Sequence, residues 1–228
     1  MRPPHSSFGN DITNRANDNN ANNNNNNNGN GDDSNGIPPH IARMGGTLLI
    51  SRIAGNGVIR VVGRCEDAKE NNNLDLSECE LMQIPDAVYH LMRHTELKTC
   101  DLSSNVIKKI PPKFAVKFSL ITDLNLSHNQ MSKLPDELAD LGSLKRLDIS
   151  HNSFIVLPPV VFKMPKLEEL RANNNEIIEI DTDQMITSNS LEVVDMRNNP
   201  LTRSCYMRLK NAKVNFRIEL SEWVDDDW

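Results

Sequence analysis

The chain has 228 residues, of which 38% are hydrophobic and 4% aromatic, and its formal net charge is −6. This acidic balance argues against nucleic acid as the principal ligand, because binding to phosphate groups requires a basic surface. A membrane span is not expected either, since Arg52 and Arg60 interrupt the most apolar window, residues 46–63.

Residues 1–43 differ in composition from the rest of the chain. Residues 17–30 are nearly all asparagine, so the segment has few apolar side chains to offset the entropy lost on folding. We therefore predict that residues 1–43 are disordered and that residues 44–228 form one elongated domain.

The compartment is predicted from two features of the sequence. The start of the chain shows no signal-peptide pattern, and the four cysteines have no paired spacing. Reduced, buried thiols are the expected state, which favours the cytoplasm and leaves the nucleus open as a further compartment.

Residues 44–70 are predicted to form an N-terminal cap. Apolar residues recur at helical spacing up to Cys65, which favours an amphipathic capping helix over residues 57–70. The alternative is a β-hairpin made of residues 48–54 and 58–62.

Residues 71–201 contain one eleven-residue apolar phrase six times. The third copy, residues 121–131, reads ITDLNLSHNQM and follows the pattern LxxLxLxx(N/C)xL. Positions are counted here from the first residue of the phrase. The ninth position holds asparagine or cysteine at intervals of 23 to 26 residues: Cys79, Asn105, Asn129, Asn152, Asn175 and Asn199.

Each phrase predicts a short strand, because its third to eighth positions alternate between polar and apolar residues. Six strands stacked in parallel would bury their leucines in one continuous core. The asparagine at the ninth position can donate and accept hydrogen bonds, so it is expected to turn inward and satisfy backbone groups where the strand ends. Cys79 is interpreted as a small buried substitute in this structural ladder.

A return segment follows each phrase. In the first four repeats it begins with Ile-Pro or Leu-Pro, and the proline predicts an extended or 3₁₀ segment on the convex side. The fifth repeat lacks the proline and has Gln184 and Thr187 where apolar residues are expected, so its convex side should be looser. The outer core is predicted to contain Val88, Leu91, Phe114, Leu138, Leu141, Val161 and Met164.

Residues 202–228 are predicted to form a C-terminal cap and an acidic tail. A short helix is expected within residues 202–212, and strict alternation over residues 214–220 predicts a closing strand at the edge of the sheet. Trp223 is expected to pack on this cap.

The concave surface is the candidate protein-binding site. The third, fifth, seventh and eighth positions should point away from the core and cover this surface. Its first half is acidic, which predicts a partner protein with a basic segment over the first three repeats; a hydrated face that only maintains solubility is the alternative. The candidate residues are Asp75, Glu78, Asp101, Asp123, Asn125, His128, Arg146, Asp148, His151, Arg171, Asp195 and Arg197.

Two further clusters carry weaker signals. His128 and His151 occupy the same position in adjacent repeats, but they lack the helical spacing or thiolate partner of a zinc site, so no metal is predicted. Lys108, Lys109, Lys113 and Lys117 form a basic convex cluster that could meet an acidic peptide or a membrane surface, or could be ordinary solvated lysines.

The phrase and its Leu-Pro returns resemble the leucine-rich repeat superfamily in its short intracellular form. The resemblance covers about residues 57–201 and implies an α/β solenoid, or horseshoe, with six short parallel strands on the concave face. It further implies 3₁₀, extended or short helical returns on the convex face, an N-terminal capping helix, and a small, repeat-only, non-enzymatic protein.

The predicted function is that of a binding module. No nucleophile elbow, phosphate-binding glycine loop or HExxH motif is present, and leucines fill the space where a catalytic pocket would lie. We therefore predict no enzyme and no cofactor, but a monomeric scaffold that binds a protein partner on its concave face. The alternative is a regulatory subunit of a signalling enzyme, in a phosphatase or small GTPase pathway.

Overall fold

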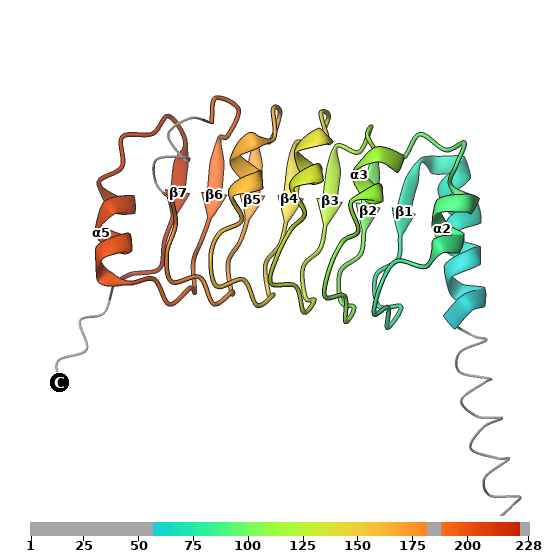
Figure 1. Cartoon of the computed structure of the whole chain (residues 1–228), viewed down its shortest axis with the longest axis horizontal. Helices are drawn as coiled ribbons and strands as arrows, with labels where there is room; N and C mark the ends of the chain where they lie inside the picture. Colours follow the sequence, from blue (N-terminus) through green and yellow to red (C-terminus); the bar gives the residue numbers. More distant parts are fainter. Residues whose placement is uncertain (1–56, 182–187, 224–228) are drawn as a thin grey trace, which may run out of the picture. The chain divides into compact units, whose positions relative to one another are not determined.

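Seven short parallel strands form the sheet of this protein (Figure 1). The computed structural model describes residues 57–181 and 188–223. The predicted α/β solenoid is confirmed, and the closing strand expected after the last repeat joins it as the seventh strand, parallel to the sixth. The strands follow in chain order: β1 (Asn73–Asp75), β2 (Thr99–Asp101), β3 (Asp123–Asn125), β4 (Arg146–Asp148), β5 (Glu169–Arg171), β6 (Val193–Asp195) and β7 (Arg217–Glu219).

The central residues of the repeat strands lie side by side in one core. Leu74 pairs in register with Cys100, and Leu124 with Leu147. Strands of three residues cannot bury a core alone, but stacking at about 4.8 Å per strand joins their apolar side chains into a continuous column. The central residues of β1–β6 are at most 2% exposed: Leu74, Cys100, Leu124, Leu147, Leu170 and Val194.

The asparagines at the ninth position connect the turns of successive repeats. Asn105 Oδ1 accepts the N–H groups of Cys79 at 3.1 Å and Leu81 at 2.9 Å, and its Nδ2 donates to the carbonyl of Leu76 at 2.8 Å. Asn129, Asn152, Asn175 and Asn199 make the same kinds of bond one repeat further each time. These amides therefore satisfy backbone groups of two repeats at once. Cys79 holds the first place, where no earlier repeat offers such groups.

The returns on the convex side begin at the predicted prolines. The first two are α-helical, α2 (Asp86–Leu91) and α3 (Lys113–Lys117), and the next two are 3₁₀ turns, η1 (Asp136–Asp140) and η2 (Pro159–Lys163). The predicted outer-core residues are buried except Leu91, which is partly buried. The predicted mixture of short helical and 3₁₀ returns is thus confirmed.

The N-terminal cap is a helix rather than a hairpin. Residues 57–71 are helical, which confirms the predicted capping helix and excludes a strand over residues 58–62. The helix buries Val61, Cys65 and Ala68, which share one face at a spacing of four and three residues. Val58 and Ile59 belong to the apolar pattern but are 64% and 70% exposed, so the buried face is narrower than the sequence suggests.

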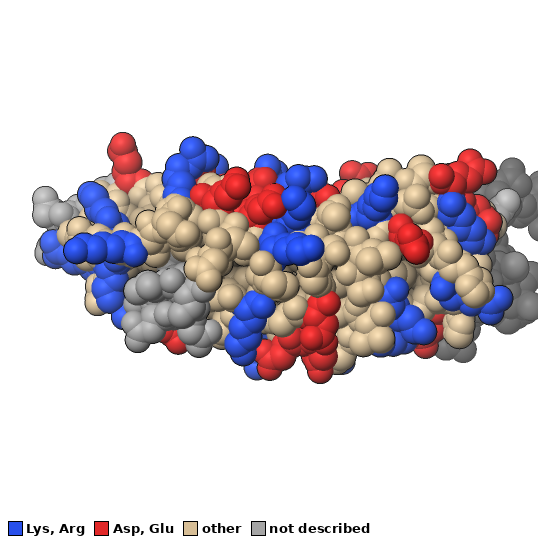
Figure 2. Space-filling model, turned by 90° about the horizontal axis from the view of Figure 1, so that it is seen from above, with Lys and Arg blue, Asp and Glu red and all other residues tan. Residues whose placement is uncertain are grey.

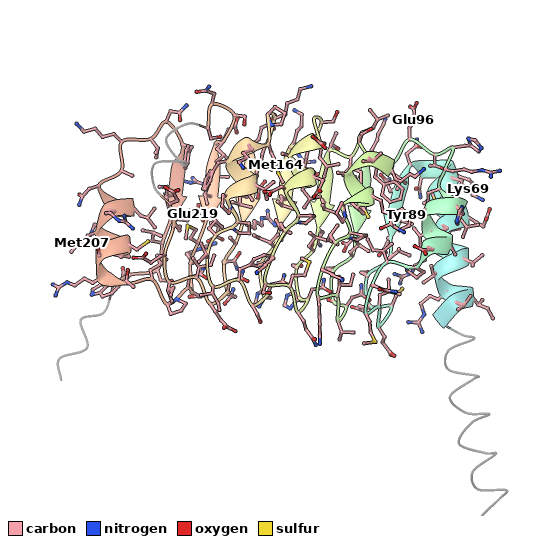
Figure 3. The ribbon with its side chains drawn as sticks, viewed as in Figure 1. Lys69, Tyr89, Glu96, Met164, Met207 and Glu219 are labelled. Atoms are coloured by element: carbon pink, nitrogen blue, oxygen red, sulfur yellow. The ribbon has the colours of Figure 1, made fainter. Side chains whose placement is uncertain are left out.

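The C-terminal cap contains helix α5 (Arg203–Lys210), within the range expected from the sequence. Thr202 begins it, since the threonine hydroxyl accepts the N–H of Cys205 at 3.2 Å. Trp223 packs on this cap, with its ring centroid 5.1 Å from that of Tyr206. Lys69 of the N-terminal helix and Met207 of α5 lie at opposite ends of the repeat array in Figure 3.

Some predictions fall on residues that the structure does not describe. The predicted disorder of residues 1–43 lies outside the described ranges, and so does the looser convex side at Gln184 and Thr187. Within the described ranges, no helix has the length and apolar character needed to cross a membrane.

Candidate functional site on the concave face

The fifth position of the phrase shapes the turn at the end of the strand in every repeat except the fifth, which has Arg171 there. Asp101 Oδ1 accepts the N–H of Ser103 at 2.8 Å, and Asp148 Oδ1 accepts that of Ser150 at 2.9 Å. Such aspartate turns are followed by a left-handed residue at the eighth position, for example His151 at φ 52°. One carboxylate oxygen is therefore used by the backbone, and the other can interact along the face.

The seventh position is less exposed than predicted. Ser127 and Ser150 are 7% and 5% exposed, so the expectation that this position points into solvent is wrong for these two repeats. Both serines lie inside the turn that the fifth-position side chain closes, through the bonds from their own N–H groups.

Arginines already neutralise most carboxylates of the face. Arg146 pairs with Asp123 on the neighbouring strand. Arg171 Nε lies 2.7 Å from Glu169, and Arg171 Nη1 lies 4.0 Å from Asp148. Figure 2 views the array from above, along the strands, and shows basic and acidic side chains beside one another on that edge as well.

The C-terminal end of the face is closed by Arg197. Its guanidinium donates to both oxygens of Asp195, at 2.9 Å and 2.7 Å, and reaches Glu219 of β7 at 3.5 Å. Burial alone would raise the pKa of Asp195, but the hydrogen bonds from Arg197 outweigh it and hold that pKa below its usual range. Asp195 is only 8% exposed, so it is a poor contact residue despite its predicted place on the site.

The N-terminal end is covered by a residue that the sequence did not indicate. Arg64 of the capping helix lies 3.2 Å from Asp75 Oδ1, which also accepts the N–H and the hydroxyl of Ser77. Burial raises the pKa of Asp75, but the bonds from Ser77 and the charge of Arg64 lower it below its usual range overall. The contact between Arg64 and Asp75 depends on how the helix packs against β1. The residue spacing in the sequence does not predict that packing.

Asp101 differs from the other carboxylates of the strands. In the part of the chain that the structure describes, its Oδ2 accepts a hydrogen bond only from the side-chain amide of Asn125, at 3.1 Å. Among the described residues no Lys, Arg or His lies within ion-pair distance of Asp101 or of the exposed Glu78. These two acids are the uncompensated charges in the first half of the face.

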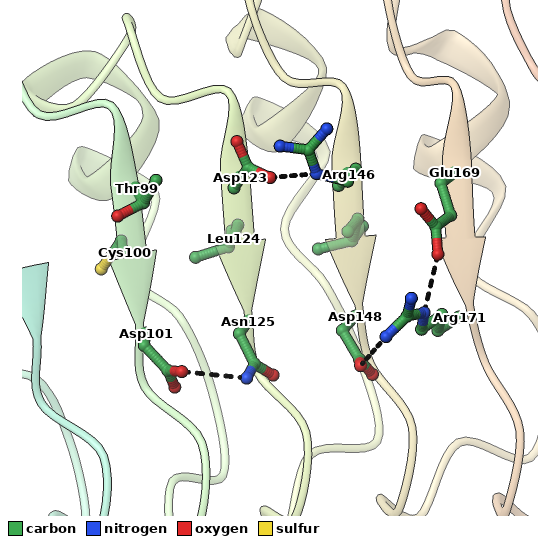
Figure 4. A pocket seen from close by; sticks show the side chains of 11 residues that line it. Thr99, Cys100, Asp101, Asp123, Leu124, Asn125, Arg146, Asp148, Glu169 and Arg171 are labelled. Atoms are coloured by element: carbon green, nitrogen blue, oxygen red, sulfur yellow. Dashed lines mark hydrogen bonds and ion pairs between the residues drawn. The ribbon is translucent and has the colours of Figure 1, made fainter. Parts of the chain in front are cut away.

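A cavity of about 320 Å³ opens beside Asp101, across β2 to β5 (Figure 4). Cys100, Leu124 and Leu147 belong to its floor and are themselves almost fully buried. Thr99 and Glu169 hold the third position of their phrases but are not among the candidate residues predicted from the sequence. The polar lining comprises Thr99, Asp101, Asp123, Asn125, Arg146, Asp148, Glu169 and Arg171, so four carboxylates face two guanidinium groups.

A second hollow of about 490 Å³ lies toward the C-terminal strands. His128 and His151 stack at its edge with ring centroids 4.0 Å apart and an angle of 11° between the rings. In the described part of the chain, no three His, Cys, Asp or Glu side chains converge as metal ligands. The four cysteines are buried free thiols, and burial raises the pKa of Cys65, Cys79 and Cys100.

Comparison with known families agrees with the repeat architecture of the sheet. The leucine rich repeat family model matches residues 95–154 and 143–201. Together with the parallel sheet and the asparagine ladder, this match identifies residues 95–201 as leucine-rich repeats. Leucine-rich repeat domains are protein–protein interaction modules, and the match indicates no catalytic family.

The chain is similar to leucine-rich repeat-containing protein 20 from Homo sapiens, with 32% identity over 95 residues. The match covers 40% of this chain and 52% of the relative, so the chain spans about half the length of that protein.

Solved structures agree in fold. A leucine-rich repeat protein from Leptospira interrogans aligns with TM-score 0.54 and 24% identity over 61% of this chain and 34% of that one. TLR13, in its complex with ssRNA13, aligns with TM-score 0.57 and 19% identity over 66% of this chain and 21% of that one. At these identities the likeness concerns the fold alone.

Proposed function

We propose that the protein is a non-enzymatic scaffold whose concave face binds a basic segment of a partner protein. The single observation that carries the proposal is Asp101, a carboxylate without a cationic neighbour among the described residues, at the edge of a cavity rich in acidic groups. A lysine or arginine side chain of the partner would supply the missing counter-charge and could donate to Asp101 Oδ2.

The cavity explains why the partner would bind at these repeats. Its lining has an excess of negative charge, because Asp101, Asp123, Asp148 and Glu169 outnumber the two arginines. Carboxylates on strands about 4.8 Å apart repel one another unless a cation lies between them. Binding a basic side chain here would therefore relieve repulsion that the arginines of the chain leave uncompensated.

The proposal narrows the binding site expected from the sequence. Asp75 and Asp123 were predicted to act together with Asp101, but Arg64 and Arg146 already pair with them. A partner would have to displace these arginines to use those two carboxylates. Asp101 and the neighbouring Glu78 need no such exchange, so we place the main contact on them.

The test is replacement of Asp101 by asparagine. Asn125 holds the same position in the next repeat and accepts the N–H of Ser127 at 3.0 Å, so an amide can keep the turn while the charge is lost. Affinity capture followed by mass spectrometry should yield a partner with the wild-type chain, and its affinity should fall at least tenfold with Asp101→Asn. Asp136→Asn on η1 is the matched control, because this exposed acid lies on the convex side. Equal losses in both variants, or none in either, would place the partner elsewhere.

The same experiment separates the scaffold from a regulatory subunit. If the captured protein is a phosphatase or belongs to a small GTPase pathway, its rate is measured with and without the chain. A scaffold leaves the rate unchanged and alters only location, whereas a regulatory subunit changes the rate itself. The cytoplasmic location and the monomeric state stay predictions, and light scattering should give a mass near 25.7 kDa for the monomer.

A further inference from the structure

A second surface lies along the edge of the array where the chain leaves the strands and turns toward the returns (Figure 1). Backbone bonds hold neighbouring repeats together here, for example from Gln130 N–H to Ile107 O at 3.0 Å and from Ile178 N–H to Ile155 O at 3.0 Å. The twelfth and thirteenth positions of successive repeats therefore lie side by side. They hold Lys108 and Lys109, then Ser132 and Lys133, then Ile155 and Val156, then Ile178 and Glu179.

The basic part of this edge has no internal counter-charge. Lys108, Lys109 and Lys133 are exposed, and in the described part of the chain no carboxylate lies within ion-pair distance of them. The basic cluster noted in the sequence is divided by the structure, because Lys113 pairs with Asp86. Lys108 and Lys109 of that cluster, together with Lys133, thus place uncompensated positive charge beside the apolar part of the edge.

The apolar side chains of this edge are strongly exposed to solvent. Ile155 and Val156 are 53% and 50% exposed, and Ile178 in the next repeat is 41% exposed. A groove of about 390 Å³ runs between the third and fourth repeats and is lined by Ser132, Lys133, Leu134, Ile155, Val156, Pro158 and Pro159. Lys133 belongs to both parts, so the basic and apolar regions are continuous.

The acidic limit of this edge lies in the fifth repeat. Glu176 and Glu179 are exposed there, and Glu179 lies 4.0 Å from Arg208 of α5. Charge therefore changes along the edge from positive over the second and third repeats to negative at the fifth. A ligand with its negative end over the fifth repeat would be repelled. The charge pattern of the edge therefore favours one orientation of an acidic ligand.

We propose that this basic–apolar edge, made of Lys108, Lys109, Lys133, Leu134, Ile155, Val156, Pro158 and Pro159, binds a short acidic peptide of a partner protein that carries bulky apolar side chains next to its carboxylates. The carboxylates lie over the lysines of the second and third repeats, and the apolar side chains enter the groove between the third and fourth. Six extended residues span about 20 Å, which is enough for the distance of about 10 Å across the three strands of these repeats.

This surface is separate from the concave site and does not depend on it. The two sites select opposite charges, since the concave cavity is acidic and the edge is basic. One chain could thus hold a basic and an acidic segment at the same time, which would suit a scaffold.

The experiment measures peptide binding to the full chain by fluorescence anisotropy. Two labelled probes are used, Asp-Glu-Asp-Leu-Phe-Leu and the reversed sequence, because the chain direction of the ligand is open. Control peptides replace either the three acids by their amides or the three apolar residues by serine. We expect saturable binding of at least one probe, at least fivefold weaker binding of both control peptides, and weaker binding at higher salt.

The variants separate the two parts of the edge. Lys109→Glu with Lys133→Glu should weaken probe binding at least tenfold, and Ile155→Ser with Val156→Ser should do the same. Lys166→Glu and Val116→Ser are matched controls, because both residues are exposed and lie outside the edge. All of these side chains are on the surface, so circular dichroism should show an unchanged fold in every variant.

Three results would overturn the proposal. The first is no saturable binding of either probe. The second is binding to phosphatidylserine vesicles that needs the lysines but survives the Ile155 and Val156 changes, which would indicate a membrane surface instead. The third is a concentration-dependent doubling of mass that the apolar changes abolish, which would make a second copy of the chain the occupant.

Discussion

The asparagine ladder allows a quantitative prediction for Asn152→Ala. Asn152 is 8% exposed; its Oδ1 accepts the N–H of Met131 at 2.9 Å, and its Nδ2 donates to the carbonyls of Leu126, Ile149 and Ser150. Alanine removes all four bonds. The loss of stability depends on which of the released backbone groups keep another hydrogen-bond partner.

The carbonyls are partly protected against this loss. Leu126 O still accepts from Asn129 Nδ2 at 3.1 Å, and Ile149 O still accepts from Asn175 Nδ2 at 3.0 Å. Met131 is fully buried, and its N–H has no second acceptor in the described part of the chain. An unsatisfied buried N–H costs about 1–3 kcal/mol, and each lost hydrogen bond adds about 1 kcal/mol or less. We therefore expect Asn152→Ala to lower the free energy of unfolding by about 3 kcal/mol.

Urea unfolding followed by far-ultraviolet circular dichroism measures this change. Gln130→Ala is the control, because this exposed amide lies in the same loops and makes no side-chain hydrogen bond to any described residue. It should change the free energy of unfolding by less than about 0.5 kcal/mol. A loss below about 1 kcal/mol for Asn152→Ala, or a loss equal to that of the control, would refute the ladder as the source of stability.

Three further predictions follow from local geometry. Glu78 has φ 53°, so Glu78→Ile should lower the free energy of unfolding by about 1–2 kcal/mol while Glu78→Gly does not; equal effects in urea would contradict the role of the left-handed backbone. The Tyr89 hydroxyl is buried without a hydrogen-bond partner among the described residues, so Tyr89→Phe should raise the melting temperature, with a gain of about 1 kcal/mol, and a lower melting temperature would show that the hydroxyl is satisfied. The pKa of Asp195 is held below its unfolded value, so its contribution to stability is present above that value and is lost as pH falls through the folded pKa. Asp195→Asn should therefore destabilise the protein at pH 7 and flatten its loss of stability below about pH 4, and parallel pH profiles for variant and wild type would exclude this linkage.

Much of the fold could be predicted because the signals for the strand and the turn lie within each repeat. The alternation at Leu124 and Leu126 predicts a strand, and the amide of Asn129 predicts a turn whose backbone groups need a partner; both are properties of a few adjacent residues. The stacking order then follows from repetition, since a strand of three residues has no other way to bury its apolar side chain. The helix before Asn73 was predictable for a similar reason, from apolar residues that recur at helical spacing up to Cys65.

The site could be predicted only in part, because charge pairing across repeats depends on packing. The sequence placed Asp75, Asp101 and Asp123 in equivalent positions and gave no reason to distinguish them. The three carboxylates differ in their neighbours. Arg64 of the capping helix pairs with Asp75 and Arg146 of the next strand pairs with Asp123, whereas Asp101 Oδ2 accepts from the side-chain amide of Asn125. The burial of Ser127 likewise depends on how the turn closes.

Short-range patterns in the sequence therefore determined the strands, the ladder and the returns, since backbone hydrogen bonding and burial along a repeat are local. Tertiary structure alone decided which charges stay uncompensated and where lysines adjoin exposed Ile155 and Val156. Those properties depend on distances between side chains of different repeats and of the capping helix, which only the packing of these elements sets.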